Sequence, residues 1–101
     1  MLKVISLMKR KPGMSFEEFR HWLTVEHVEL GKKLPGVRKY TVNVLQEESA
    51  DAPYDGVSEL WFDSNEARLE AFGTEAGKAA GADAAAHADR VHLLTSEHVQ
   101  I

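Results

Sequence analysis

Histidine is the residue type in this chain best suited to move a proton near neutral pH. The sequence has five histidines and no cysteine, which excludes a thiol nucleophile, a disulfide and a zinc–thiolate site. His21 and His27 are six residues apart and therefore point to different sides of a helix. His92 and His98 would lie about 20 Å apart along one strand. Because neither pair can share an ion, we expect no metal site.

His27 differs from the other histidines in its position on a predicted helix. It is the one polar member of an apolar stripe with helical spacing. The other members of the stripe are Phe16, Phe19, Leu23 and Leu30. We expect the imidazole to face the interior, either as a core histidine bonded to the backbone or as a general base in a pocket. Glu26 lies off the stripe, so its position beside His27 does not imply an acid–histidine pair.

Tyr40 is the second candidate catalytic residue. It shares one face of a predicted strand with Val42 and Val44, and we expect helices to cover that face. Its phenol then needs a partner inside the protein. If His27 reaches the same cavity, the two side chains could polarise a carbonyl or enol oxygen without a cofactor. A purely structural tyrosine is the alternative.

The segment from 78 to 89 (KAAGADAAAHAD) provides the space that such a cavity requires. Alanine and glycine fill little volume, so we expect a pocket between this segment, the first helix and the sheet. A weakly packed, low-complexity helix is the alternative. Arg20 would lie at the pocket rim. The candidate substrate-binding residues are Phe19, Arg20, Trp22 and Leu23.

Six elements must position these side chains. Strand patterns cover residues 2–8, 37–46, 57–63 and 91–101. A first helix should begin at Phe16, because Ser15 and Glu18 have capping-box spacing, and should end near residues 32–33.

A second helix should begin after Asp63, which has the same capping-box spacing with Glu66. Glycines at 73, 77 and 81 then predict short, broken helical pieces over residues 74–89. The resulting order β, α, β, β, α, β is that of an α+β, ferredoxin-like sandwich with one antiparallel four-stranded sheet. We expect one such domain over residues 1–101.

Helices can cover only one face of this sheet, yet apolar residues occur on both faces. Leu60 and Phe62 share one face of their strand, while Val57 and Trp61 share the other. We expect a homodimer that buries the uncovered faces, Trp61 included, against each other. Scattered apolar residues on a free surface are the alternative.

The overall composition limits the partners. Apolar residues make up 44% of the chain and charged residues 28%, which is typical of a globular protein, and the formal net charge is −4. This balance predicts no nucleic-acid partner. The sequence shows neither a spanning apolar run nor a signal-peptide pattern, so we expect no membrane partner and a cytoplasmic location.

Several motifs, taken together, resemble the EthD family over nearly the whole chain. They are Phe19-Arg20-His21-Trp22-Leu23 with Glu26-His27, then Leu34-Pro35-Gly36, Pro53-Tyr54-Asp55-Gly56-Val57, Glu59-Leu60-Trp61-Phe62-Asp63-Ser64 and Glu97-His98-Val99. The resemblance implies the dimeric α/β-barrel superfamily, whose members include isomerases, polyketide cyclases, quinol-forming monooxygenases and haem-degrading enzymes. Resemblance to methylmuconolactone isomerases in that superfamily implies a pocket histidine at His27 and a pocket tyrosine at Tyr40, although their cysteines have no counterpart here.

Three functional hypotheses follow. The first is a homodimer that binds a hydrophobic, aromatic or lactone metabolite and performs cofactor-free isomerase, cyclase or oxygenase-like chemistry, with His27 handling a proton and Tyr40 orienting an oxygen. The second is a non-catalytic accessory subunit of an ether- or aromatic-degrading system. The third is a haem-binding or haem-degrading protein with His27, His87 or His92 as the iron ligand.

Overall fold

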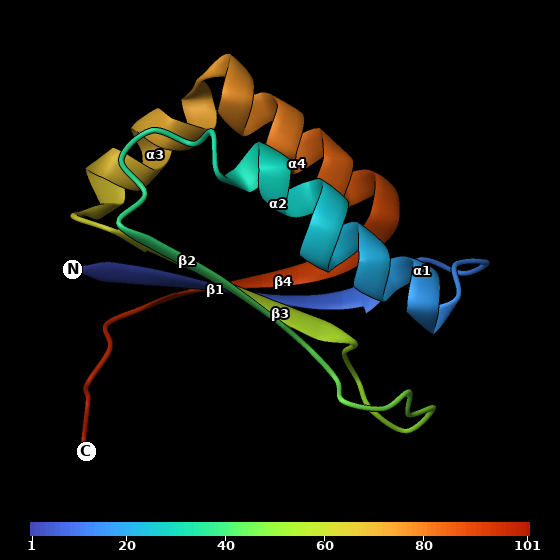
Figure 1. Cartoon of the computed structure of the whole chain (residues 1–101). Coiled ribbons are helices and arrows are strands. Elements are labelled where there is room, and N and C mark those ends of the chain that lie inside the picture. The colour runs from blue at the N-terminus through green and yellow to red at the C-terminus, as the bar shows by residue number, and fades with distance from the viewer.

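The computed structural model describes residues 1–101 and shows a layer of helices on one face of a four-stranded sheet (Figure 1). The elements are β1 (Leu2–Arg10), α1 (Phe16–His21), η1 (Trp22–Glu26), α2 (His27–Gly31), β2 (Lys39–Val44), β3 (Gly56–Phe62), α3 (Asn65–Gly73), α4 (Glu75–His87) and β4 (Ala88–Thr95). This order confirms the predicted α+β, ferredoxin-like fold.

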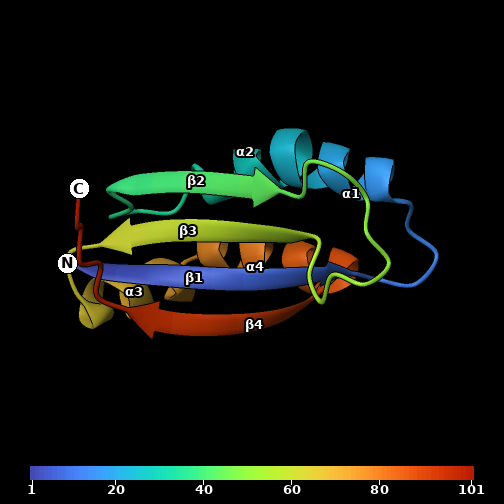
Figure 2. The ribbon, with the colours of Figure 1, turned by 90° about the horizontal axis from the view of Figure 1, so that it is seen from below.

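The sheet has the strand order β2-β3-β1-β4, with every neighbouring pair antiparallel (Figure 2). Val4 of β1 pairs with Leu60 of β3 on one side and with Leu94 of β4 on the other. Directly paired residues point to the same face of a sheet. Since Val4 and Leu60 pack with Leu34 and Ala71, these positions mark the face that the helices cover.

The first helix begins as predicted but contains a turn that the sequence pattern does not show. Ser15 and Glu18 form both bonds of the capping box. At residues 22–26 the helix widens into a π turn, in which the backbone N–H of His27 donates to the carbonyl of Trp22 five residues earlier. The extra residue lets Trp22 and Leu23 both face inward together with His27, and all three are buried. The last helical residue is Gly31, followed by Lys32 as C-cap.

The prediction of broken helical pieces after residue 74 was wrong. Residues 75–87 form one continuous helix, α4, capped by the Thr74 side chain. Gly77 does not interrupt this helix. Its lack of a side chain lets α4 pack closely on α3, since a Cβ at position 77 would lie 2.4 Å from the Cα of Phe72. The alanines around it favour the helical state and offset the cost of the glycines.

The strand boundaries also differ by a few residues from the expectation, and two differences have a clear structural reason. Ser64, not Asp63, caps α3 by accepting a hydrogen bond from the backbone N–H of Ala67. Asp63 instead forms an ion pair with Arg38, at 2.6 Å. The last strand ends at Thr95 rather than at residue 101, because β1, its pairing partner, extends only to Lys3 in that register.

The core consists of two apolar clusters. One cluster comprises Met8, Phe19, Trp22, Leu23, Ala84 and Ala88. The other comprises Val4, Leu34, Leu60, Phe62 and Ala71. Tyr40 packs against the second cluster, as expected for a residue on the helix-covered face of β2.

The opposite face of the sheet has no helical cover (Figure 1). Trp61 lies on it, as predicted, with the ammonium groups of Lys3 and Lys39 at 4.7 and 4.8 Å from its ring. These lysines shield the indole, which is only 8% exposed. Val91 and Leu93 on β4 are 43% exposed and form the open apolar part of this face. None of the helices is both long enough and apolar enough to cross a membrane.

Candidate functional site

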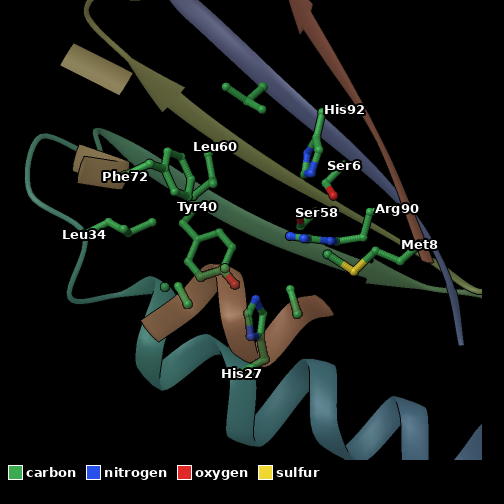
Figure 3. Close-up of a pocket in the computed structure, with 15 residues that line it drawn as sticks. Ser6, Met8, His27, Leu34, Tyr40, Ser58, Leu60, Phe72, Arg90 and His92 are labelled. Carbon is green, nitrogen blue, oxygen red and sulfur yellow. The ribbon is translucent and has the colours of Figure 1, made fainter. Parts of the chain in front are cut away.

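A cavity of about 60 Å³ lies between the sheet and the helices α2 and α4 (Figure 3). A second hollow of about 220 Å³ continues from it along β4 and α3. The two spaces share Val4, Phe72, Gly81, Arg90 and His92. We call the first space the inner cavity and the second its mouth.

His27 projects into the inner cavity from the start of α2. Its Nδ1 lies 2.8 Å from Oδ2 of Asp83 on α4, and its side chain is 9% exposed. An ionised carboxylate only accepts hydrogen bonds, so Nδ1 carries the hydrogen of the neutral ring. The Nε2 lone pair is then free on the cavity side, where Figure 3 shows the ring pointing. This arrangement is suited to a general base.

Trp22 fixes the position of this pair. Its indole Nε1 donates to the same Oδ2 of Asp83 at 3.0 Å. Its ring contacts the rings of both His27 and His87, with both centroid distances at 4.7 Å. His87 also bonds the backbone oxygen of Asp83 through Nδ1, at 2.7 Å. The orientation of His27 therefore does not depend on a bound ligand.

Tyr40 approaches the same space from β2. Burial raises the pKa of its phenol to about 12, so the hydroxyl remains protonated at neutral pH and can donate to a ligand oxygen. The ring lies directly against Gly31, where a Cβ would be 2.6 Å from a ring carbon and 2.9 Å from the hydroxyl oxygen. Glycine at position 31 is what allows Tyr40 to reach the cavity.

The sheet side of the cavity carries polar groups from three strands. Ser6 lies on β1 and pairs in register with Ser58 of β3 and His92 of β4. The hydroxyl of Ser6 is buried and has no hydrogen-bond partner. Burial, with smaller contributions from the charges of Arg90 and Arg68, lowers the pKa of His92 below its ordinary 6.5.

The predicted site residues separate into two groups. The structure brings His27 and Tyr40 to one cavity. Trp22 packs against the His27 ring at a tilt of 34° but does not itself line the cavity. Phe19 and Leu23 are fully buried in the core and do not line the cavity. Arg20 also lies elsewhere: its guanidinium donates to the carbonyl of Gln46 at 3.3 Å and stacks over Phe16. No three His, Asp or Glu side chains lie close enough together to hold a metal ion.

Sequence reasoning missed Asp83, Ser6 and Arg90. A usable signal existed for Asp83, which is the only acidic residue between Ala76 and Ala88 in a segment whose small residues mark an inward face. Nothing local marks Ser6 or Arg90, because their proximity to the cavity follows from pairing between strands that are far apart in sequence.

Comparison with known families gives one match. Residues 11–91 match the EthD domain. A search of curated proteins finds no match.

Solved structures with the same fold are similar over nearly the whole chain. An ethyl tert-butyl ether D (EthD) family protein from Bacillus halodurans is 25% identical with a TM-score of 0.81, and the match covers 97% of this chain and 99% of that one. A dimeric ferredoxin-like protein of unknown function from Thermobifida fusca is 18% identical with a TM-score of 0.75, over 95% and 90% of the two chains. SnoaB, a cofactor-independent oxygenase from Streptomyces nogalater, is 12% identical with a TM-score of 0.70, over 99% and 95%.

Proposed function

The chain belongs to the EthD domain family, and we propose that it binds a small organic molecule in the inner cavity and transfers a proton within that molecule without a cofactor. The observation that carries the proposal is the 2.8 Å contact between His27 and Asp83, which leaves one ring nitrogen free on the cavity side. The fold that this chain shares with a cofactor-independent oxygenase supports it.

The proposed chemistry begins with removal of a proton from a carbon beside a carbonyl group. Nε2 of His27 takes the proton, and the electron pair of the broken C–H bond moves onto the carbonyl oxygen. The phenol of Tyr40 donates a hydrogen bond to that oxygen and stabilises its charge. Asp83 stabilises the imidazolium that forms. Return of the proton to a different carbon completes an isomerisation. Attack of the enolate carbon on a second carbonyl of the same ligand, whose oxygen then takes the proton back from His27, completes a cyclisation.

The lining of the cavity supports a hydrophobic, aromatic or lactone ligand. Apolar side chains of Met8, Leu34, Leu60 and Phe72 line the inner cavity. A cavity that holds benzene measures about 150 Å³, so the inner cavity of about 60 Å³ fits only the reacting end of a ligand. The remainder of the molecule would extend into the mouth.

The test incubates the protein in D₂O with a panel of lactones, phenols and naphthols. NMR monitors proton exchange and turnover of each compound. The wild type should exchange a C–H proton of at least one compound, and His27→Gln should abolish the exchange while ligand binding persists. His87→Gln is the matched control, because His87 contacts the same aspartate and tryptophan but does not line the cavity. Equal exchange rates in the two variants would refute the proposal. Binding without exchange in the wild type would favour the accessory-subunit hypothesis, and a Soret shift on haem titration would favour the haem hypothesis.

We also propose that the chain forms a homodimer through the uncovered sheet faces. The exposed Val91 and Leu93 and the half-buried Ile5 and Leu7 next to them support this assembly. Similarity to structures of dimeric proteins with this fold also supports it. Leu93→Lys should give monomers in light scattering, whereas Leu94→Lys, on the opposite face of the same strand, should not. A dimer that survives Leu93→Lys together with Trp61→Lys would contradict this interface.

A further inference from the structure

We propose that the cavity recognises an organic anion, and that the substrate carries a carboxylate bound by Arg90 and Ser6. The inference rests on the proposed function, since it names the substrate class of the same site. It follows from the charges around the two spaces, an unpaired buried hydroxyl and the direction from which these groups enter.

The charged side chains that line the cavity and its mouth are positive, although the whole chain has a net charge of −4. Arg90 lines both the inner cavity and the mouth, and Arg68 lines the mouth. No aspartate or glutamate lines either space. An anionic ligand would therefore meet only attraction at the entrance.

Arg90 forms no ion pair within the chain, unlike Arg10 and Arg38. Those two arginines each lie 2.6 Å from a carboxylate, Glu48 and Asp63 respectively. Arg68 donates only to the neutral side chain of Asn65, at 2.8 Å. A guanidinium that lines a cavity without a partner has its donors available, and its planar fork matches a carboxylate.

Ser6 gives an independent indication of a ligand. The residue is 5% exposed, and its hydroxyl oxygen lines the inner cavity without any hydrogen-bond partner. Buried hydroxyls are nearly always paired, because leaving one unpaired is destabilising. A ligand oxygen in the inner cavity would supply the missing partner.

Groups on one side of the cavity would then bind the carboxylate of a ligand, while His27 on the other side would act on its carbon atoms. Figure 3 shows Arg90, Ser6 and His92 entering from the sheet, opposite His27 on the helix side. Tyr40 reaches the same space from β2. The register places Arg90 opposite Met8 on β1, two residues along from Ser6. A carboxylate held by Arg90 and Ser6 would direct the neighbouring carbon atoms toward His27.

The experiment compares each of two carboxylates, benzoate and 2-naphthoate, with its neutral amide by isothermal titration calorimetry on the full chain. The wild type should bind at least one carboxylate about tenfold more tightly than its amide, as expected for a charge-assisted hydrogen bond. Arg90→Gln should remove this preference without weakening amide binding. Ser6→Ala should weaken carboxylate binding several-fold, and Arg38→Gln, a surface control, should change neither affinity.

His27→Gln separates this inference from the proposed function. It should abolish proton exchange but keep the preference for the carboxylate. If the wild type binds acid and amide equally, or binds neither carboxylate at millimolar concentration, the anion site is refuted, whereas His27-dependent exchange with a neutral compound would still support the proposed function. Retention of the full preference in Arg90→Gln would also refute it.

Discussion

The two sides of the cavity differ in whether their polar groups are already paired. On the helix side, Asp83 accepts hydrogen bonds from both His27 and Trp22, and its backbone oxygen is bonded by His87. On the sheet side, the Ser6 hydroxyl and the Arg90 guanidinium have no partner within the chain. A paired network holds its geometry before a ligand arrives, whereas unpaired donors gain most when one binds. We therefore propose that His27 on the helix side performs the chemistry and that Arg90 and Ser6 on the sheet side bind the ligand.

Asp83→Asn should have the largest effect on proton exchange, because it removes the carboxylate that pairs with His27 on the helix side of the cavity. The amide cannot stabilise an imidazolium as a carboxylate does, so we expect proton exchange to fall about a hundredfold or more. Carboxylate binding on the sheet side should change little. Asp89→Asn is the matched control, since Asp89 pairs with Lys11 at the surface, at 2.6 Å. Exchange at the wild-type rate in Asp83→Asn would show that the pairing of His27 is only structural.

Gly31→Ala should have the next largest effect, through Tyr40. The new methyl group would lie 2.6 Å from the tyrosine ring, so the ring must move, at a cost of about 1–3 kcal/mol of folding free energy. Chemical denaturation measures the loss, and the fluorescence of a bound naphthol would report the displaced ring. Gly81→Ala is the contrasting variant, because a Cβ there meets nothing within 4 Å. It should leave stability unchanged or raise it, by up to about 1 kcal/mol.

The sequence could predict the helix side of the cavity better than the sheet side, for a physical reason. His27 belongs to a stripe whose spacing is a property of one helix, so its inward position follows from local periodicity. Its partner Asp83 is 56 residues away, and Ser6 and Arg90 line the same cavity only because β1 pairs with β4. The π turn at Trp22 is equally hidden, because it results from packing rather than from a residue type that requires it.

Ser6→Ala should raise the stability of the free protein but lower its affinity for a carboxylate. Removing an unpaired buried hydroxyl should stabilise the free protein, by about 1 kcal/mol, while carboxylate affinity falls. Ser15→Ala gives the opposite sign of stability change, because it removes the N-cap of α1, at a cost of about 1 kcal/mol. Thermal unfolding of both variants measures the difference. A marked loss of stability in Ser6→Ala would show that its hydroxyl already has a partner, and the contrast between the two sides would disappear.

The smallest expected effect is on the part of the pH dependence of folding stability that comes from His92. Because His92 lies on the sheet side of the cavity, this effect reports on that side directly. In the free protein its pKa lies below the ordinary value because of burial and the nearby charges of Arg90 and Arg68. The unfolded chain therefore binds this proton more readily, so stability should fall as the pH drops through the ordinary histidine range near 6.5. His92→Gln should remove that part of the pH dependence. A bound carboxylate would neutralise the arginines, so the pKa of His92, measured by NMR titration, should rise when benzoate binds. If the pKa is the same with and without benzoate, the anion does not lie beside these arginines, and the sheet side is not the recognition surface.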